Sequence, residues 1–335
     1  MRVDAGELLD RCATALERHG APALAARRQA EQLVEGELRG HPSHGIQRLA
    51  ILVARLDAGL IVPGAHPELT WRAASALLVD GRGGFGPVIA DQVLDALEPR
   101  ARETGVAVAA VHRSHHLGML APYVERVASA GLVGMMFTTT EGLVHPWGGA
   151  GSLVGTNPIA IGVPSRDGPV VLDMSTAASS AGRILHHAAR GEPIPAGWGV
   201  DADGRSTTDA AAVAAISPFG GAKGYALGIT LGAMVGLLSG TSFGSDVAGT
   251  LDGDRPVTKG DVVVVIDPAA FGVDPGDPAM ARYLDAVRAS GADGAVVGIP
   301  GDRARAARAA ALEHGVEVDA HSWAAVQRLA AGGRA

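Results

Sequence analysis

The chain of 335 residues has little cysteine, little lysine and few aromatic residues. Its one cysteine, Cys12, excludes an internal disulfide and a thiolate cluster around a metal. The formal charge is −7 with no basic patch, which excludes the usual footprint of a nucleic-acid-binding protein. The first residues lack the apolar core of a secretory signal, so we expect a cytoplasmic protein.

Long uncharged runs are also scarce, and only residues 224–245 form one long enough to cross a bilayer. Glycine recurs there at every fourth position from Gly224 to Gly244, but Ser and Thr dilute the run and an aromatic anchor stands at one end only. A ridge of glycines lets another backbone pack closely. We therefore interpret the run as a buried helix and expect no membrane partner.

The order of apolar and turn-forming residues predicts an α/β fold that begins with helices. Helical spacing covers most of residues 1–40 and then 46–56, and the helical part is expected to form a unit over 1–75 with an α/β body over 76–335. In that body, strands are predicted at 76–79, 106–111, 132–138, 159–163, 170–172, 262–266 and 294–299, and helices at 88–103, 123–130, 278–290, 303–314 and 322–329.

Glycine is abundant, and residues 81–86 match the pattern G-x-G-x-x-G between a predicted strand and a predicted helix. A Rossmann unit needs an acidic residue about 20 positions later, at the end of the next strand. Here His112 follows that strand instead. We interpret the glycines as a plain turn, with a dinucleotide loop as the alternative.

Histidine and arginine gather in the segment G-H-P-S-H-G-I-Q-R. Ser43 suits a helix N-cap, which would place His44 in the first turn and Arg48 one turn later on the same face. An imidazole can move a proton to or from a carbonyl oxygen while a guanidinium holds a carboxylate at two points. The alternative is a capped, solvated helix face.

A second pair, His115 and His116, follows the predicted strand at 106–111, where α/β proteins commonly bind ligands. Neighbouring side chains point in different directions, so we expect one of the two to face a pocket. The alternatives are a structural histidine and a metal site, but the glutamate of a zinc-binding helix motif is absent and no carboxylate cluster lies nearby in the sequence, so no metal is predicted.

Two further residues stand out by position. Lys223, one of only two lysines, lies in the glycine-rich approach G-G-A-K-G-Y, where an ammonium beside backbone N–H groups would suit a phosphate. Asp173 ends an apolar strand, where a poorly solvated carboxylate can orient an imidazole. The alternatives are a solvated lysine and a helix cap.

The order of these motifs resembles the malate/L-lactate dehydrogenase family. The segments G-H-P-S-H-G-I-Q-R, S-H-H-L-G, H-P-W-G-G, G-T-N-P, V-L-D-M-S-T, G-G-A-K-G-Y and I-P-G-D-R carry the resemblance from about residue 30 to about residue 305. It implies the family's own mixed-sheet α/β fold rather than a classical Rossmann domain, NAD or NADP as cofactor, and a homodimer with its active site near the interface. Glycine at 232, where many members have a glutamate, is a departure from the pattern.

The resemblance also implies roles for individual residues. Proton transfer falls to His116, or to a pair formed by His44 and Asp173, and the sequence does not decide between them. Substrate-binding positions are Ser43, Arg48, Thr156 and Asn157. Cofactor-binding positions are Thr140, Asp173, Met174, Ser175, Lys223, Gly301, Asp302 and Arg303.

These features predict an oxidoreductase that moves a hydride between NAD(P) and a small 2-hydroxy or 2-oxo acid resembling malate or lactate. Two alternatives remain open from the sequence, a reductase of a cyclic 2-imino acid and a catalytically silent protein that binds a metabolite. The choice between NAD and NADP and the identity of the acid are not fixed by these motifs.

Overall fold

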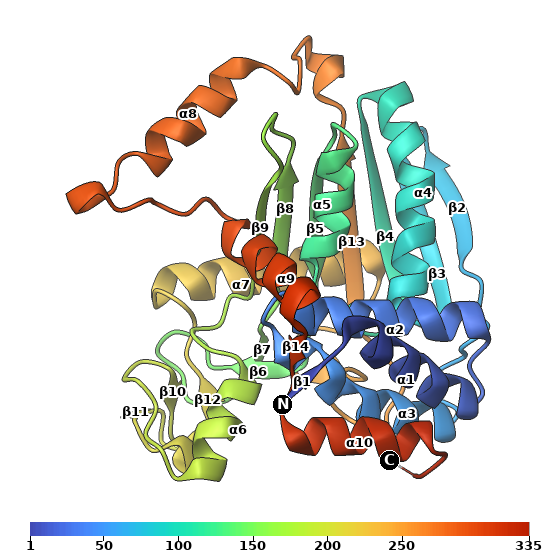
Figure 1. The fold of residues 1–335 in the computed structure, drawn as a ribbon, viewed down its shortest axis with the longest axis vertical. Coiled ribbons are helices and arrows are strands. Elements are labelled where there is room, and N and C mark those ends of the chain that lie inside the picture. The colour runs from blue at the N-terminus through green and yellow to red at the C-terminus, as the bar shows by residue number, and fades with distance from the viewer. Residues whose placement is uncertain (335) are drawn as a thin grey trace.

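The computed structural model describes residues 1–334, with a seven-stranded mixed sheet at its centre (Figure 1). The strand order is β2-β3-β4-β13-β5-β8-β9, in which only β3 and β4 are parallel neighbours. The strands are β2 Glu68–Ala73, β3 Ala76–Gly84, β4 Val106–Ser114, β5 Val133–Thr138, β8 Ile159–Val163, β9 Val170–Met174 and β13 Gly260–Ile266. The predicted α/β fold is confirmed, and the mostly antiparallel sheet differs from the parallel sheet of a Rossmann domain.

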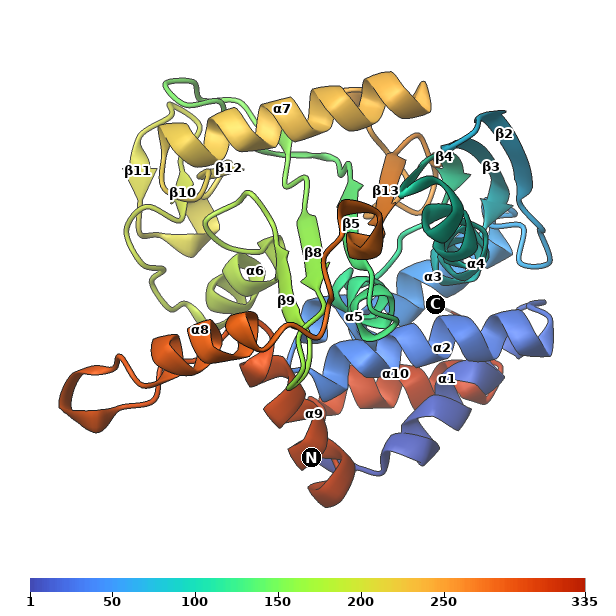
Figure 2. The same cartoon turned by 90° about the horizontal axis from the view of Figure 1, so that it is seen from above.

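Helices cover both faces of this sheet (Figure 2). On one face lie α4 (Gly86–Thr104) and α5 (Ala121–Ser129), whose apolar stripes pack on the sheet in one core. On the other face lies α7 (Ala222–Ser239), which packs on β5 and β13 through residues such as Leu231 and Val235. Since helices shield both faces, the central strands carry the near-continuous apolar runs seen in the sequence.

A layer of helices from both ends of the chain lies at one end of the sheet. It contains α1 (Ala5–Arg18), α2 (Ala23–Leu38), α3 (Leu49–Asp57) and α10 (Ala320–Ala330), which share one apolar core that also buries Cys12. The short strands β1 (Arg2–Val3) and β14 (Val316–Glu317) pair beside it. The helices predicted in the first 60 residues are confirmed, and the boundary at residue 75 stays a prediction.

A smaller sheet and three helices complete the chain. The sheet order is β11-β10-β12-β6-β7, with β6 Gly142–Val144, β7 Val154–Gly155, β10 Gly199–Val200, β11 Ser206–Thr207 and β12 Ala215–Ile216. The helices are α6 Ala181–Arg190, α8 Pro278–Arg288 and α9 Asp302–His314. Helix α8 projects from the body (Figure 1) and buries only Leu284.

Two expectations need correction. The strand predicted at 294–299 is wrong: Val296 and Val297 are exposed and follow α8 along its projecting segment, so no neighbouring strand is available to pair with them. The glycine-ridged helix α7 is buried on one face only, because Leu237 and Leu238 on its other side are exposed. By length and composition α7 is the one helix among residues 1–334 that could span a membrane.

The glycines of the G-x-G-x-x-G segment pack against protein backbone. A Cβ at Gly81 would lie 2.7 Å from the carbonyl oxygen of Arg113, and one at Gly86 would lie 2.4 Å from the carbonyl oxygens of His115 and His116. The first of these glycines end β3 and the last begins α4. The segment therefore brings two elements close to the histidine pair.

Candidate active site

The first histidine of the site stands on a chain of tight turns between α2 and α3. Pro42–His44 and Ile46–Arg48 form two 3₁₀ turns, and α3 starts only at Leu49. The predicted N-cap role of Ser43 is therefore wrong; its hydroxyl instead lies 3.1 Å from Nδ1 of His44. The extended backbone of Gly45 separates the turns and leaves room for the Glu37 carboxylate. Burial, helped by Arg48, lowers the pKa of His44 to about 4, so its imidazole is neutral at pH 7.

The second histidine, His116, lies in the loop that leaves β4 and stacks on His44. The two ring centroids are 5.6 Å apart and the rings are inclined by 24°. The backbone N–H of Gly118 donates to Nδ1 of His116 at 3.2 Å, and burial holds the pKa of His116 well below its usual value. A neutral imidazole whose Nδ1 accepts a hydrogen bond carries its proton on Nε2. His116 thus presents an N–H donor.

Arg48 and His116 line the same small cavity. Its volume is about 10 Å³, room for about one water molecule, and its walls are Arg48, Ile51, Leu52, Arg55, His115, His116, Gly249 and Thr250. Nη1 of Arg48 donates to the carbonyl oxygen of Thr250 at 3.1 Å, while its buried Nε has no partner among residues 1–334. A guanidinium with a free edge can hold a carboxylate at two points. His44 is not among the wall residues.

His115 also lines the cavity, although we expected only one histidine of the pair to do so. Its Nε2 lies 2.9 Å from the carbonyl oxygen of Leu60, and burial lowers its pKa to about 3. A neutral imidazole that hydrogen-bonds a carbonyl oxygen has its Nε2 proton engaged. His115 is thus tied to the loop after α3, whereas the Nε2 of His116 has no such bond.

Residues 249–255 form the segment that closes the cavity, and two residues that the motifs did not predict hold it in place. Arg55 donates from Nη1 to the carbonyl oxygen and carboxylate of Asp252, and from Nη2 to the carbonyl oxygen of Arg255. Glu141 accepts hydrogen bonds from the backbone N–H groups of Thr250 and Leu251. Arg55 could have been predicted from the sequence, because it lies two helical turns after Arg48. Glu141 is distant in the sequence and approaches the site only through the fold.

Asp173 lies at the end of β9 and caps a helix rather than an imidazole. Its Oδ2 accepts hydrogen bonds from the N–H groups of Leu120 and Ala121 at 2.9 and 2.8 Å, at the start of α5. Burial raises its pKa to about 6 although these bonds oppose the shift. Within residues 1–334, neither His44 nor His116 hydrogen-bonds to this carboxylate. The sequence predicted that Asp173 caps a helix that follows it, whereas Asp173 caps α5, which precedes it in the chain.

Thr140, Thr156 and Asn157 form one hydrogen-bonded group between the two sheets. The Thr140 hydroxyl accepts from the N–H of Thr156 at 2.8 Å, and the Thr140 N–H donates to Oδ1 of Asn157 at 3.3 Å. Nδ2 of Asn157 donates to the carbonyl oxygen of Gly228 in α7 at 2.9 Å. A Cβ at Gly232 would lie 2.6 Å from that Nδ2, so the departure at this position makes room for Asn157.

The remaining predicted cofactor positions lie at the starts of two helices and the end of one strand. Lys223 is exposed in the first turn of α7, after Gly220 and Gly221 with φ of +58° and +66°. Gly301, with φ of +99°, caps α9, and Arg303 is exposed in its first turn. The N–H of Val171 donates to the carbonyl oxygen of Pro300, which holds this helix start beside β9.

Other members of these groups are engaged within the chain. Asp302 accepts from the N–H of Ile299 and from Arg305, and the Ser175 hydroxyl accepts from the N–H of Ala177. Met174 pairs with Ile159 across β8 and β9. Asp302 thus shapes the start of α9, where Arg303 is exposed, and Ser175 shapes the chain that follows β9. Lys223 is the exposed cation at the start of α7.

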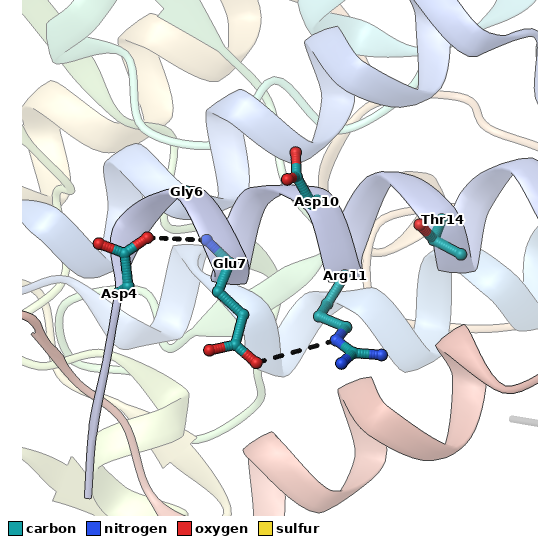
Figure 3. Close-up of a pocket in the computed structure, with 6 residues that line it drawn as sticks. All are labelled: Asp4, Gly6, Glu7, Asp10, Arg11 and Thr14. Carbon is teal, nitrogen blue, oxygen red and sulfur yellow. Dashed lines mark hydrogen bonds and ion pairs between the residues drawn. The ribbon is translucent and has the colours of Figure 1, made fainter.

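A larger surface depression lies away from this site. Figure 3 shows it along α1, where Asp4 caps the helix and Glu7 faces Arg11. Its lining is Asp4, Gly6, Glu7, Asp10, Arg11 and Thr14. These contacts stay within one helix, so the depression supplies no group of catalytic side chains. Over residues 1–334, no three His, Cys, Asp or Glu side chains lie close enough to hold a metal ion.

A half-buried arginine with a free edge, beside a neutral imidazole that offers an N–H, is the arrangement of an enzyme site for small carboxylic acids. The comparison with known families then identifies the family to which this site belongs. A family model described as malate/L-lactate dehydrogenase matches residues 3–327. The chain therefore belongs to the malate/L-lactate dehydrogenase family, as its motifs predicted.

Known relatives share the fold but differ in substrate. The crystal structure of a dehydrogenase from Sinorhizobium meliloti is 46% identical, with a TM-score of 0.94 over 98% of each chain. A (2R)-3-sulfolactate dehydrogenase (NADP(+)) from Chromohalobacter salexigens is 38% identical, over 77% of this chain and 78% of the relative. A Delta(1)-pyrroline-2-carboxylate reductase from Pseudomonas fluorescens is 37% identical, over 90% and 91%. The two curated relatives are equally similar, so identity does not choose between their substrates.

Proposed function

We propose that the chain is an NAD(P)-dependent oxidoreductase that interconverts a small 2-oxo or 2-imino acid and its reduced form. The observation that carries this proposal is the cavity where Arg48 and the N–H of His116 meet. When bound, the cofactor exchanges a hydride with carbon 2 of the acid. A proton must reach the carbonyl oxygen or imine nitrogen at the same time.

In this proposal Arg48 binds the substrate carboxylate in place of the Thr250 carbonyl oxygen, which its Nη1 now contacts. His116 gives the proton from Nε2 during reduction, because Gly118 holds its Nδ1 as an acceptor. His44 supports the ring of His116 by stacking, and Ser43 fixes His44. This assigns proton transfer to His116 rather than to a pair of His44 and Asp173.

In this proposal the cofactor binds at the N-terminal ends of α7 and α9. The first N–H groups of α7 and the exposed ammonium of Lys223 together suit a diphosphate. The exposed guanidinium of Arg303, at the start of α9, adds a second cation near the beginning of β9. We assign Thr140, Asp173, Met174 and Ser175 to the wall that positions the nicotinamide half, with Thr156 and Asn157 behind them.

The test is oxidation of NADH and of NADPH, measured separately, with a panel of 2-oxo acids and cyclic 2-imino acids. We expect turnover with one cofactor at least, and His116→Asn to lower kcat about 10²–10⁴-fold while cofactor binding, followed by fluorescence, stays intact. His44→Asn should cost less than His116→Asn. Wild-type kcat in a variant that carries both His44→Asn and His116→Asn would contradict the mechanism. Absence of cofactor binding in the wild type would contradict the reaction class.

We also propose that the chain works in the cytoplasm as a homodimer with the exposed face of α7 in its interface. Beyond Lys223 this helix has no charged residue, and its exposed side chains include Leu227, Ile229, Leu237 and Leu238. An uncharged apolar face suits a second copy of itself, since a two-fold interface brings like residues together without charge repulsion. The opposite face of α7 holds Asn157, which would place the interface near the site.

Light scattering after size-exclusion chromatography tests the dimer. Leu237→Glu, on the exposed face of α7, should convert dimers to monomers. Leu24→Glu is a matched control, because Leu24 on α2 is a leucine at least as exposed as Leu237. A monomeric wild type, or a dimer unaffected by Leu237→Glu, would contradict this interface. Localisation is tested by fractionating cells that express the tagged chain.

A further inference from the structure

The charges around the cavity leave one cation for a substrate. Arg55 is 2% exposed, and both of its Nη atoms donate to the closing segment, one of them to the carboxylate of Asp252. Among residues 1–334 Arg48 forms no ion pair: its Nη1 donates to a carbonyl oxygen, and the carboxylate of Glu141 acts on its charge only from a greater distance. Arg55 thus has a direct counter-ion within the described chain, and Arg48 does not.

The other cations near the cavity are also engaged. Lys259 forms a buried ion pair with Asp261, with Nζ at 2.5 and 2.7 Å from the two carboxylate oxygens. His115 is tied to Leu60 and is neutral, as described above. The carboxylate of Glu141 accepts from the N–H groups of Thr250 and Leu251 and so holds the closing segment. Among the wall residues of the cavity, no cation other than Arg48 is left to pair with a second negative group on a substrate.

Apolar side chains of α3 form part of the cavity wall. Ile51 and Leu52 line the cavity on α3, and Leu52 is 5% exposed. Cδ1 of Ile51 lies 3.5 Å from the position of a Cβ on Gly253, so this side chain faces the closing segment. A wall of this kind favours a methyl, ethyl or ring methylene group and offers a carboxylate or sulfonate no hydrogen bond.

We propose that the substrate is a monoanion, a 2-oxo or cyclic 2-imino acid with one carboxylate and a small apolar side chain. This inference rests on the proposed function and narrows it. Arg48 binds the single carboxylate, and the side chain packs on Ile51 and Leu52. Reduction consumes one hydride from NAD(P)H and one proton and gives NAD(P)⁺ and the 2-hydroxy or 2-amino acid. Dianions such as 3-sulfopyruvate are disfavoured because their second charge would lose its water without gaining a counter-ion.

The test compares kcat/KM for 2-oxobutyrate and Δ1-pyrroline-2-carboxylate with kcat/KM for oxaloacetate and 3-sulfopyruvate. We expect the better monoanion to exceed both dianions by about 100-fold. Turnover that favours a dianion overturns this inference and leaves the reaction class standing. Failure of all four substrates overturns the proposed function together with the inference, so the two failures are distinguishable.

A charge placed in the apolar wall provides a second test. Ile51→Lys adds a cation beside the closing segment, and Ile51→Met is the matched control of similar length without the charge. We expect Ile51→Lys to raise the ratio of kcat/KM for oxaloacetate to that for 2-oxobutyrate by about 10-fold or more, and Ile51→Met to leave it within about 2-fold. An equal shift in both variants would overturn the electrostatic argument. The wild-type comparison stands even if Ile51→Lys fails to fold.

Discussion

Gly86 shows how one residue governs the position of the histidine pair. It begins α4, and a side chain there would collide with the carbonyl oxygens of His115 and His116 at 2.4 Å. The absence of a Cβ lets α4 approach the loop that carries the proposed proton donor. The glycine is required by this backbone contact rather than by a nucleotide, which is the physical meaning of the G-x-G-x-x-G match.

We therefore expect Gly86→Ala to lower the free energy of unfolding by about 1–3 kcal/mol and to reduce kcat, because the loop of His116 must move to admit the methyl group. Urea denaturation and steady-state kinetics measure the two effects. Gly64→Ala is the control, since a Cβ at Gly64 would make only an ordinary contact with Pro22 at 3.5 Å. Wild-type stability in Gly86→Ala would contradict the packing seen here.

Variants of Asp173 can distinguish a carboxylate that caps a helix from one that takes part in catalysis. Its Oδ2 holds two backbone N–H groups at the start of α5, so Asp173→Ala should lower the free energy of unfolding by about 1–3 kcal/mol. Asp173→Asn keeps an acceptor oxygen and should recover part of that loss; any effect through the cofactor wall should fall on KM for the cofactor, with kcat at saturating cofactor close to wild type. Thermal unfolding and kcat are the measurements. If Asp173→Asn lowers kcat as strongly as His44→Asn, the pair suggested by the sequence holds instead.

At the scale of elements, the turns that carry His44 and Arg48 are fastened to α2 by a buried carboxylate. Oε1 of Glu37 accepts from the N–H of Ile46 at 2.8 Å. Burial, together with the charge of Asp319, raises the pKa of Glu37 to about 7. Since the pKa is higher in the folded chain than in the unfolded chain, Glu37 favours folding at low pH. This contribution is lost as pH rises from about 4 to about 7.

Glu37→Gln should therefore stabilise the protein at pH 8 by about 1–3 kcal/mol relative to wild type, and the difference should disappear near pH 4.5. An amide oxygen at this position still accepts from Ile46, so the turns should keep their shape. Chemical denaturation at both pH values measures the difference. A variant that is less stable than wild type at pH 8 would show that the ionised carboxylate is needed to hold the turns.

At the scale of the whole molecule, burial keeps three histidines neutral. The pKa falls to about 4 for His44 and about 3 for His115, and it lies well below the usual value for His116. The folded chain therefore binds fewer protons than the unfolded chain at acid pH. The histidine contribution to stability is complete above about pH 6.5 and is lost as pH falls toward about 4.

His115→Gln should remove about one proton from this linkage. Between pH 6 and pH 4.5, we expect the slope of unfolding free energy against pH to become less steep by about 1.4 kcal/mol per pH unit. Denaturant titrations across this range give the slope, and His66→Gln at an exposed position controls for the loss of a histidine. An unchanged slope in His115→Gln would mean that this imidazole is protonated in the folded protein.

The sequence by itself determined the reaction class and the α/β fold, and it predicts the main site positions, because the motifs are local and carry their chemistry in adjacent residues. The apolar runs at 159–163 and 262–266 likewise predicted strands that the structure contains. A strand at 294–299 was wrong because an apolar run needs a neighbour, which local pattern does not reveal.

Only the tertiary structure decided which groups meet. It stacked His116 on His44, gave the carboxylate of Asp173 to α5, and brought residues 249–255 over a cavity formed by residues of α3, the turn before it and the loop after β4. Charges that neutralise one another across such a distance, as Asp252 and Arg55 do, leave no local pattern in a sequence. The number of free cations in the site, and with it the proposed substrate charge, follows from packing because pairing depends on distance in space.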